Sequence, residues 1–266
     1  MQLLKNLLRN GFSLLGLEIR KKVLNSLEKT TYFPIEFTEN EKKIFNYIRT
    51  NNLSMTSDER LFSTILLCKY IITEKIPGDF VECGVWRGGN SILAASIFQE
   101  YGVKKKVYLF DTFEGMTRPT EFDRQASDGL PAEIEFSKSQ HHNYNEWCYA
   151  SLNEVQENFR KAGLLNDNII FVKGDVLQTL AEASLLPSKI SVLRLDTDWY
   201  ESTKVELEIL YPRVSVGGGI IIDDYGHWSG AKKATDEYFD KFGSRPLLHY
   251  IDYTGRLGIK IKNCDI

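Results

Sequence analysis

The chain has 266 residues, of which 42% are hydrophobic and 26% charged, and this ordinary globular composition excludes a disordered or collagen-like protein. It carries 33 Lys and Arg against 36 Asp and Glu, so the formal net charge is −3. This slightly acidic balance excludes a broad nucleic-acid-binding surface, and we expect no nucleic-acid partner.

The first 75 residues show helical periodicity, which predicts an N-terminal helical extension over residues 1–75. Residues 1–27 mix apolar and basic side chains and lack the cleavage site of a signal peptide. We expect them to form a helix packed on its own domain; the alternative is a surface helix that touches a membrane or a second subunit. The helical front is also the surface through which we expect a homodimer to form. Later in it, Thr56 and Ser57 precede two acids, which is typical of a helix start.

The cysteines and the apolar runs bear on where the protein works. The four cysteines form no C-x-x-C pair, which argues against a disulfide scaffold or a structural zinc site. The longest apolar stretches are shorter than the roughly 18 to 20 residues that cross a bilayer. Together these features predict a cytoplasmic protein with reduced thiols.

From Gly78 onward, short apolar runs alternate with helical patterns. The expected strands are 79–83, 106–110, 169–172, 190–195, 219–222, 247–251 and 257–261, and the expected helices are 90–100, 152–162, 202–210 and 231–242. Continuous apolar strands separated by helices predict a mostly parallel sheet with helices on both faces. A turn at Thr254-Gly255 joins the last two strands as a hairpin, so the last strand must be antiparallel. We therefore expect one seven-stranded α/β domain over residues 76–266.

One stretch, residues 116–145, breaks this alternation. It has two prolines, an Asp128-Gly129 turn signal, the pair His141-His142 and little periodicity. A structureless insert of this length is usually a functional lid or a mobile segment. Because it follows the second strand, we expect it to lie over the carboxyl edge of the sheet.

Ligands of open α/β sheets bind outside the carboxyl ends of the strands, and the first two strands end in suitable residues. Gly84 permits a tight turn, and Gly88-Gly89 lets a ligand approach the backbone, although a plain strand-to-helix turn explains them equally well. The spacing is not G-x-G-x-x-G, which argues against a nicotinamide dehydrogenase. Asp111 follows the second strand and suits the hydroxyls of a ribose, with a helix cap as the alternative.

Four carboxylates follow the fourth and fifth strands: Asp196, Asp198, Asp223 and Asp224. If these strands are neighbours, so many like charges repel unless a cation is present. Oxygen ligands suit a hard cation, Mg²⁺ or alternatively Ca²⁺ or Mn²⁺. The other interpretation is that these acids cap helices or pair with a nearby basic residue.

Four motifs follow one another along the chain. They are Gly78–Gly89, Asp111–Met116, Leu195–Thr203, and Gly217–Gly219 leading to Asp223–Tyr225. Together they resemble the macrocin O-methyltransferase family, whose members methylate sugar hydroxyls in macrolide and aminocoumarin antibiotics. The resemblance runs from about residue 55 to residue 262. It implies a class I methyltransferase (Rossmann-like) fold that uses S-adenosylmethionine and Mg²⁺.

The resemblance also implies roles for individual residues. Asp196, Asp223 and Asp224 match the metal ligands, and Asp198 matches the position proposed as general base. A histidine, His227 or the loop residue His142, is the alternative base, although His142 is more simply explained as a solvated loop residue. The expected cofactor-binding residues are Thr56, Ser57, Glu82, Gly84, Arg87, Gly88, Ser91, Asp111, Thr112, Phe113, Gly174, Asp175 and Asp196. The aromatic residues Trp86, Trp199, Tyr200 and Trp228 either stack on a sugar or pack in the core.

The expected function is therefore S-adenosylmethionine- and Mg²⁺-dependent O-methylation of a sugar or a glycosylated substrate. The alternatives are a catechol-type phenol O-methyltransferase and a non-catalytic scaffold that binds S-adenosylmethionine. The insert matches the family least and is where an acceptor would be recognised. The acceptor is expected to be a small molecule or a saccharide, with a natural product, a polysaccharide and a glycolipid all open.

Overall fold

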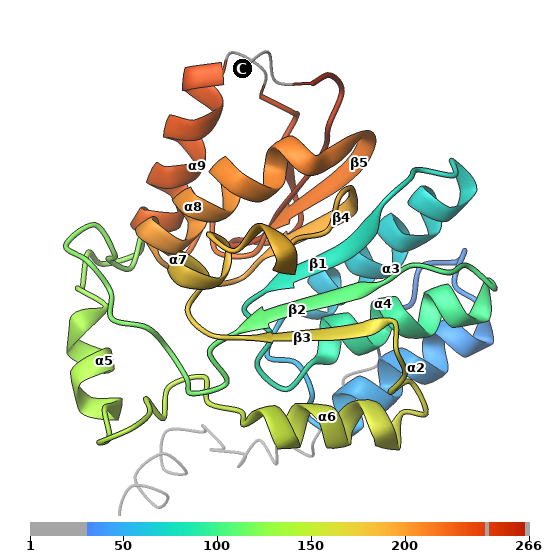
Figure 1. Cartoon of the computed structure of the whole chain (residues 1–266), viewed down its shortest axis with the longest axis horizontal. Helices are drawn as coiled ribbons and strands as arrows, with labels where there is room; N and C mark the ends of the chain where they lie inside the picture. The colour runs from blue at the N-terminus through green and yellow to red at the C-terminus, as the bar shows by residue number, and fades with distance from the viewer. Residues whose placement is uncertain (1–30, 243–244, 264–266) are drawn as a thin grey trace, which may run out of the picture. The chain divides into compact units, whose positions relative to one another are not determined.

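The structure is a computed structural model that describes residues 31–242 and 245–263 (Figure 1). Residues 34–266 group into one compact unit, so residue 75 is not a structural boundary. The helices α2 (Glu39–Thr50) and α3 (Asp58–Thr73) pack against α4 (Gly89–Glu100), and α3 also contacts two strands of the sheet. The predictions for residues 1–27 lie outside the described residues. No helix within the described ranges is long and apolar enough to span a membrane.

The start of α3 follows directly from its sequence. The Ser57 hydroxyl accepts a hydrogen bond from the backbone N–H of Arg60, and Asp58 and Glu59 occupy the first turn. Both features stabilise the positive end of a helix. The predicted helix start is confirmed. It places Thr56 and Arg60 near the carboxyl ends of the strands.

The sheet has seven strands in the order β3-β2-β1-β4-β5-β7-β6. The strands are β1 (Asp79–Cys83), β2 (Val107–Asp111), β3 (Ile169–Lys173), β4 (Ile190–Leu195), β5 (Val214–Ile222), β6 (His249–Tyr250) and β7 (Arg256–Ile259). Strands β1 to β5 pair in parallel, whereas β7 is antiparallel to both β5 and β6. This arrangement confirms the predicted sheet. Strand β5 begins earlier than expected and β6 is shorter.

Helices cover both faces of the sheet. Because successive residues of a strand point to opposite faces of the sheet, neighbouring residues of β1 contact the helices on the two faces. Val81 belongs to a core cluster with Leu207 of α8 (Tyr200–Leu210), which packs beside α7 (Val176–Thr179) and α9 (Ser229–Phe242). Phe80 instead contacts Phe98 of α4, with ring centroids 6.5 Å apart. The predicted helical cover of both faces is confirmed.

The insert at residues 116–145 is not structureless, which corrects the sequence-based expectation. It contains α5 (Glu133–Ser139), which stands beyond the end of β2 (Figure 1). The buried carboxylate of Asp123 accepts hydrogen bonds from the backbone N–H groups of Thr120 (2.6 Å) and Tyr200 (2.7 Å). Polar contacts with distant segments thus help to hold the insert, and such contacts leave no periodic apolar signal in the sequence. The helix α6 (Leu152–Lys161) follows it and leads into β3.

Candidate active site

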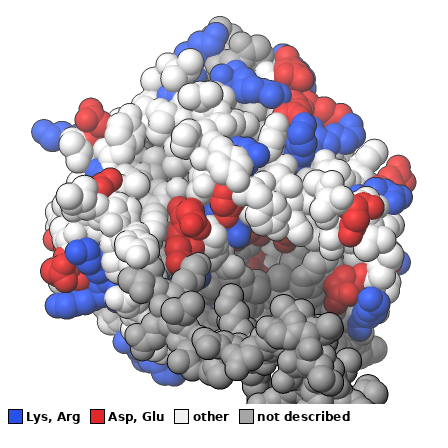
Figure 2. All heavy atoms as spheres, turned by 180° about the vertical axis from the view of Figure 1, so that it is seen from behind, with Lys and Arg blue, Asp and Glu red and all other residues white. Residues whose placement is uncertain are grey.

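A cavity of about 220 Å³ opens at the carboxyl ends of the strands, where the strand order reverses between β1 and β4. Such a reversal is where open α/β sheets bind ligands. Eleven of the predicted site residues line this cavity: Thr56, Glu82, Gly84, Asp111, Thr112, Gly174, Asp175, Asp196, Asp198, Asp223 and Asp224. On the face shown in Figure 2, acidic side chains gather around a central hollow, and the basic ones are dispersed rather than joined in one patch.

The loop after β1 requires glycine at its first position. Gly84 has a φ of +79°, and a Cβ there would lie 1.9 Å from the backbone oxygen of Asp196. The carboxylate of Asp111 then holds the loop by accepting hydrogen bonds from the backbone N–H groups of Val85 (2.6 Å) and Trp86 (3.2 Å). Burial raises the pKa of Asp111, and these N–H donors partly offset that rise. Asp111 therefore organises the loop that lines the cavity.

Arg194 is a buried residue beside the cavity that the sequence interpretation missed. It lies in β4 with its side chain 1% exposed, and Nη1 is 2.8 Å from Glu82 and 2.6 Å from Asp196. Its Nη2 pairs with Asp223. One guanidinium thus joins the carboxylates of three strand ends. The signal that could have found it is a charged residue inside an otherwise apolar strand, because a charge there must be paired.

The carboxylates outnumber the cations around them. Burial raises the pKa of Glu82 to about 7 and that of Asp198 to about 7. Burial also raises the pKa values of Asp196 and Asp224 well above their usual range, and the neighbouring carboxylates raise them further. Against the five carboxylates of this group, which includes Asp223, the described residues place only two guanidinium groups in contact, those of Arg60 and Arg194.

This donor set fits a hard divalent cation. Asp196, Asp223 and Asp224 each offer a carboxylate oxygen, and these oxygens lie within 4.8 Å of one another. Carboxylate oxygens are the preferred ligands of Mg²⁺. The unbalanced negative charge supplies an electrostatic reason for a further cation. These three residues would therefore hold the ion.

Asp198 is held in a strained position beside this group. Its φ is +68°, in the left-handed region that non-glycine residues seldom adopt. One carboxylate oxygen accepts a hydrogen bond of 2.7 Å from the indole N–H of Trp228, and Trp199 packs edge-to-face on that indole. Trp199 and Trp228 are buried and do not line the cavity, whereas Trp86 does.

The structure does not bring the two histidine candidates into the cavity. A ring nitrogen of His227 lies 3.0 Å from the hydroxyl of Tyr253, and burial lowers the pKa of His227. His142 is exposed and lines an adjoining pocket, which shares Thr112 and Asp175 with the cavity. The assignment of either histidine as the base is therefore not supported by position, because packing directs His227 to Tyr253 and leaves His142 in solvent.

Five predicted cofactor-binding residues do not line the cavity but support the segments around it. Ser57 caps α3 and donates to Asp252 at 2.6 Å, and Ser91 donates to Glu82. Arg87 pairs with Glu154 at 2.6 Å. The other two are Gly88, whose φ of +89° turns the chain into α4, and Phe113, which is buried.

Among lining residues that were not predicted, Arg60 stands out. It enters the acid group from the first turn of α3 and contacts Asp223. A basic residue in the first turn of a helix opposes the helix dipole, and that was the available signal. Asn90 and Cys148 also line the cavity and carry no comparable signal in the sequence.

Glu206 predicts a pH dependence of stability. This buried carboxyl on α8 accepts a hydrogen bond of 2.9 Å from the Thr197 hydroxyl, and burial raises its pKa to about 8, from 4.5. Between pH 4.5 and 8 the folded state binds this proton and the unfolded state does not, so rising pH lowers the free energy of unfolding, by at most about 1.4 kcal/mol per pH unit. Glu206→Gln is expected to remove this pH dependence. The free energy of unfolding of the variant should therefore increase relative to that of the wild type as pH rises.

Urea unfolding of both proteins at pH 5 and pH 8.5 measures the difference. An equal gap between Glu206→Gln and wild type at the two pH values would contradict the prediction.

The comparisons with known proteins agree with this geometry. Residues 17–257 match the sequence model of the macrocin-O-methyltransferase family. The chain is 37% identical over 206 residues to demethyldecarbamoylnovobiocin O-methyltransferase of Streptomyces niveus, covering 77% of this chain and 74% of that one. It is 34% identical over 203 residues to a Streptomyces olivaceus enzyme, 8-demethyl-8-(2,3-dimethoxy-alpha-L-rhamnosyl)-tetracenomycin-C 4'-O-methyltransferase, covering 76% and 73%.

Solved structures show the same fold. The O-methyltransferase NovP superposes with a TM-score of 0.67 at 35% identity, over 79% of this chain and 83% of that one. Calicheamicin methyltransferase CalS11 superposes with a TM-score of 0.57 at 19% identity, over 86% and 94%, which bears on the fold alone. The fold is that of class I O-methyltransferases, and the sequence match extends through the strand ends that build the cavity. This chain is an O-methyltransferase that belongs to the macrocin-O-methyltransferase family.

Proposed function

We propose that this enzyme transfers the methyl group of S-adenosylmethionine to a hydroxyl of a sugar or a glycosylated small molecule, with Mg²⁺ as the metal. One observation carries the proposal: a single cavity combines a glycine loop, the carboxylate of Asp111 and a cluster of three further carboxylates. The family supports methyl transfer, and one relative is named for a compound that carries a rhamnosyl group. The acid cluster favours this function over that of a binding scaffold, because so many buried charges are costly to keep.

In this proposal the cofactor lies along the carboxyl ends of β1, β2 and β3. Its methionine end is placed by Glu82 and Gly84, and its ribose by Asp111. Asp175, which caps α7 by accepting a hydrogen bond of 2.9 Å from Leu177 N–H, lies at the adenine end. All four cofactor contacts line the same cavity.

The acceptor binds at the opposite end, beside Asp196, Asp223 and Asp224, which would hold Mg²⁺. When bound, the cation would lower the pKa of a coordinated hydroxyl. Asp198, oriented by Trp228, takes the proton. The hydroxyl oxygen bonds to the methyl carbon while the carbon–sulfur bond breaks, which releases S-adenosylhomocysteine. Most of the acceleration comes from holding both substrates in line.

Methyl transfer to defined acceptors tests the proposed function. The full chain is incubated with S-adenosylmethionine and Mg²⁺, and sugar nucleotides, rhamnosides and catechols are compared by mass spectrometry. We expect a methylated sugar whose formation stops in a chelator and in Asp198→Asn. Methylation of catechols alone would assign the enzyme to the phenol-directed class instead.

Asp111→Asn is expected to weaken S-adenosylmethionine binding by about tenfold or more, which corresponds to about 1.4 kcal/mol. The asparagine amide would place its NH₂ or its single oxygen against the N–H groups of Val85 and Trp86, which now share one carboxylate oxygen. It would also offer the ribose one acceptor oxygen fewer. Calorimetric titration of the cofactor measures the change. Unaltered affinity would exclude Asp111 from the cofactor site.

We also propose that the protein is a homodimer, and contact of its basic N-terminal stretch with a membrane is the alternative to packing of that stretch on its own domain. The support is the composition of residues 1–27, which lie outside the described residues. Light scattering of the full chain tests the first point, and flotation with anionic vesicles tests the second. A monomer that stays with the aqueous fraction would refute both.

A further inference from the structure

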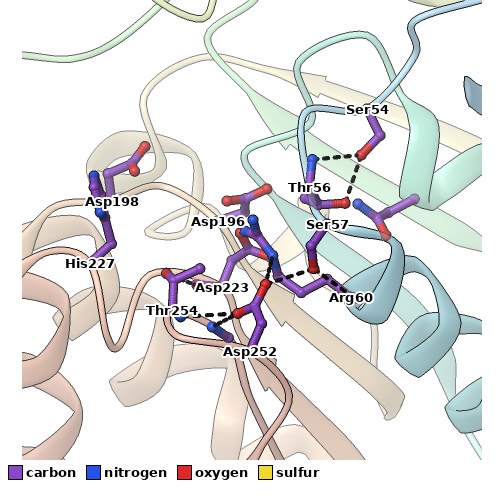
Figure 3. Close-up of polar contacts among 12 residues, drawn as sticks. Ser54, Thr56, Ser57, Arg60, Asp196, Asp198, Asp223, His227, Asp252 and Thr254 are labelled. Atoms are coloured by element: carbon purple, nitrogen blue, oxygen red, sulfur yellow. Dashed lines mark hydrogen bonds and ion pairs between the residues drawn. The ribbon is translucent and has the colours of Figure 1, made fainter. Parts of the chain in front are cut away.

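Arg60 places a positive charge inside the cluster that is proposed to bind metal. Its Nη1 pairs with one carboxylate oxygen of Asp223 (Figure 3). Arg194 pairs with the other oxygen. Both side chains are nearly inaccessible, since Arg60 is 14% exposed and Asp223 only 3%. In this arrangement, guanidinium groups face both oxygens of a residue that is needed as a metal ligand.

Arg60 has a second anchor that lies outside the metal cluster. Its Nε is 2.9 Å from Oδ2 of Asp252, a residue of the turn that precedes β7, and the two form an ion pair without the geometry of a hydrogen bond. The carboxylate of Asp252 is itself fixed by the Ser57 hydroxyl at 2.6 Å and by the backbone N–H of Gly255 at 2.7 Å. Arg60 can therefore lose its ion pair with Asp223 and still keep the one with Asp252, because Asp252 is not among the proposed metal ligands.

We propose that Arg60 is a resident counter-cation that competes with the divalent metal for Asp223. In the metal-free protein its charge compensates Asp223. When a metal ion is bound, its charge would repel the nearby guanidinium of Arg60, and Arg60 would keep only its ion pair with Asp252. Arg60 thus lowers the affinity for metal while stabilising the empty site. This inference rests on the proposed metal site.

Titration with Mn²⁺ alone, without cofactor or acceptor, tests the proposal. Arg60→Gln is expected to bind Mn²⁺ about tenfold more tightly than the wild type, because one repelling charge is removed. Arg60→Lys keeps the charge and should stay close to the wild type. Arg160→Gln is the matched control, since it removes the same charge from an exposed pair with Glu157 on α6.

Thermal unfolding supplies a second measurement. In a chelator, Arg60→Gln should unfold at a lower temperature than the wild type, because Asp223 loses a counter-charge. Saturating Mn²⁺ should reduce this difference in unfolding temperature between the two proteins, since the metal then supplies the missing positive charge. A purely structural role for Arg60 would leave the gap unchanged.

The outcomes separate the two claims. Equal or weaker Mn²⁺ binding by Arg60→Gln overturns the competition while leaving the metal site intact. Failure of both the wild type and Arg60→Gln to bind Mn²⁺ overturns the metal site and, with it, the competition. Tighter binding that is shared by Arg160→Gln would reflect net charge alone and would also overturn it.

Discussion

Asp224→Asn is expected to weaken metal binding strongly and at the same time to stabilise the metal-free protein. Burial raises the pKa of Asp224, and the charges of Asp198 and Asp223 raise it further. The amide removes a ligand oxygen but also relieves this repulsion, so we expect at least about a 100-fold loss of Mn²⁺ affinity, about 2.8 kcal/mol. We expect the free energy of unfolding in a chelator to rise by about 1 kcal/mol.

Opposite signs for binding and stability are the signature of a residue kept for function. Calorimetry with Mn²⁺ and urea unfolding in a chelator measure the two effects. Asp240→Asn is the control: it removes an exposed carboxylate that is paired with Arg245, and it should change neither quantity appreciably. Undiminished metal affinity in Asp224→Asn would remove this residue from the proposed ligand set.

Gly84→Ala is expected to cause a large loss of stability. The added Cβ would lie 1.9 Å from the backbone oxygen of Asp196, and the φ of +79° would itself be strained for alanine. Because backbone atoms have little room to move, we expect a loss of at least about 3 kcal/mol in the free energy of unfolding. Relief of the clash would also displace Asp196 and thereby weaken metal binding.

Gly163→Ala separates the clash from the conformational strain. Gly163 has a similar φ, +71°, but its added Cβ would meet nothing within 4 Å. This variant should lose only about 1 kcal/mol, the cost of the left-handed conformation. Urea unfolding compares the two variants. Equal losses would show that the approach of β1 and β4 at this turn is less tight than the structure has it.

The contrast between Arg60 and Arg194 matters for how this site tolerates its charges. Arg194 touches three carboxylates from within β4 and is 1% exposed, so it has no other place to go. Arg60 touches one carboxylate of the cluster and a second one outside it. Arg194 is therefore a permanent part of the sheet edge. In our proposal, Arg60 is a charge that a metal ion can displace from Asp223.

The strands of the sheet and every acidic residue that lines the cavity could be predicted from the amino-acid sequence. Apolar runs marked the strands, and Ser57 with its following acids marked α3, because capping and burial act over a few residues. Acids at the ends of predicted strands marked the site, because parallel strands present their carboxyl ends at one edge. Asp111 and Asp196 were predicted in this way and line the cavity.

Which charges meet, and which side chains face away from the cavity, depends on tertiary packing. Arg60 reaches Asp223 because α3 packs at the end of β5, and no local pattern around either residue specifies that contact. His227 follows the acid pair closely in sequence, yet its ring turns to Tyr253. The structure of the insert was missed because polar contacts with distant segments, such as that of Asp123 with Tyr200, help to hold it. Ion pairs and buried polar anchors join distant segments, and their partners are therefore set by packing rather than by periodicity.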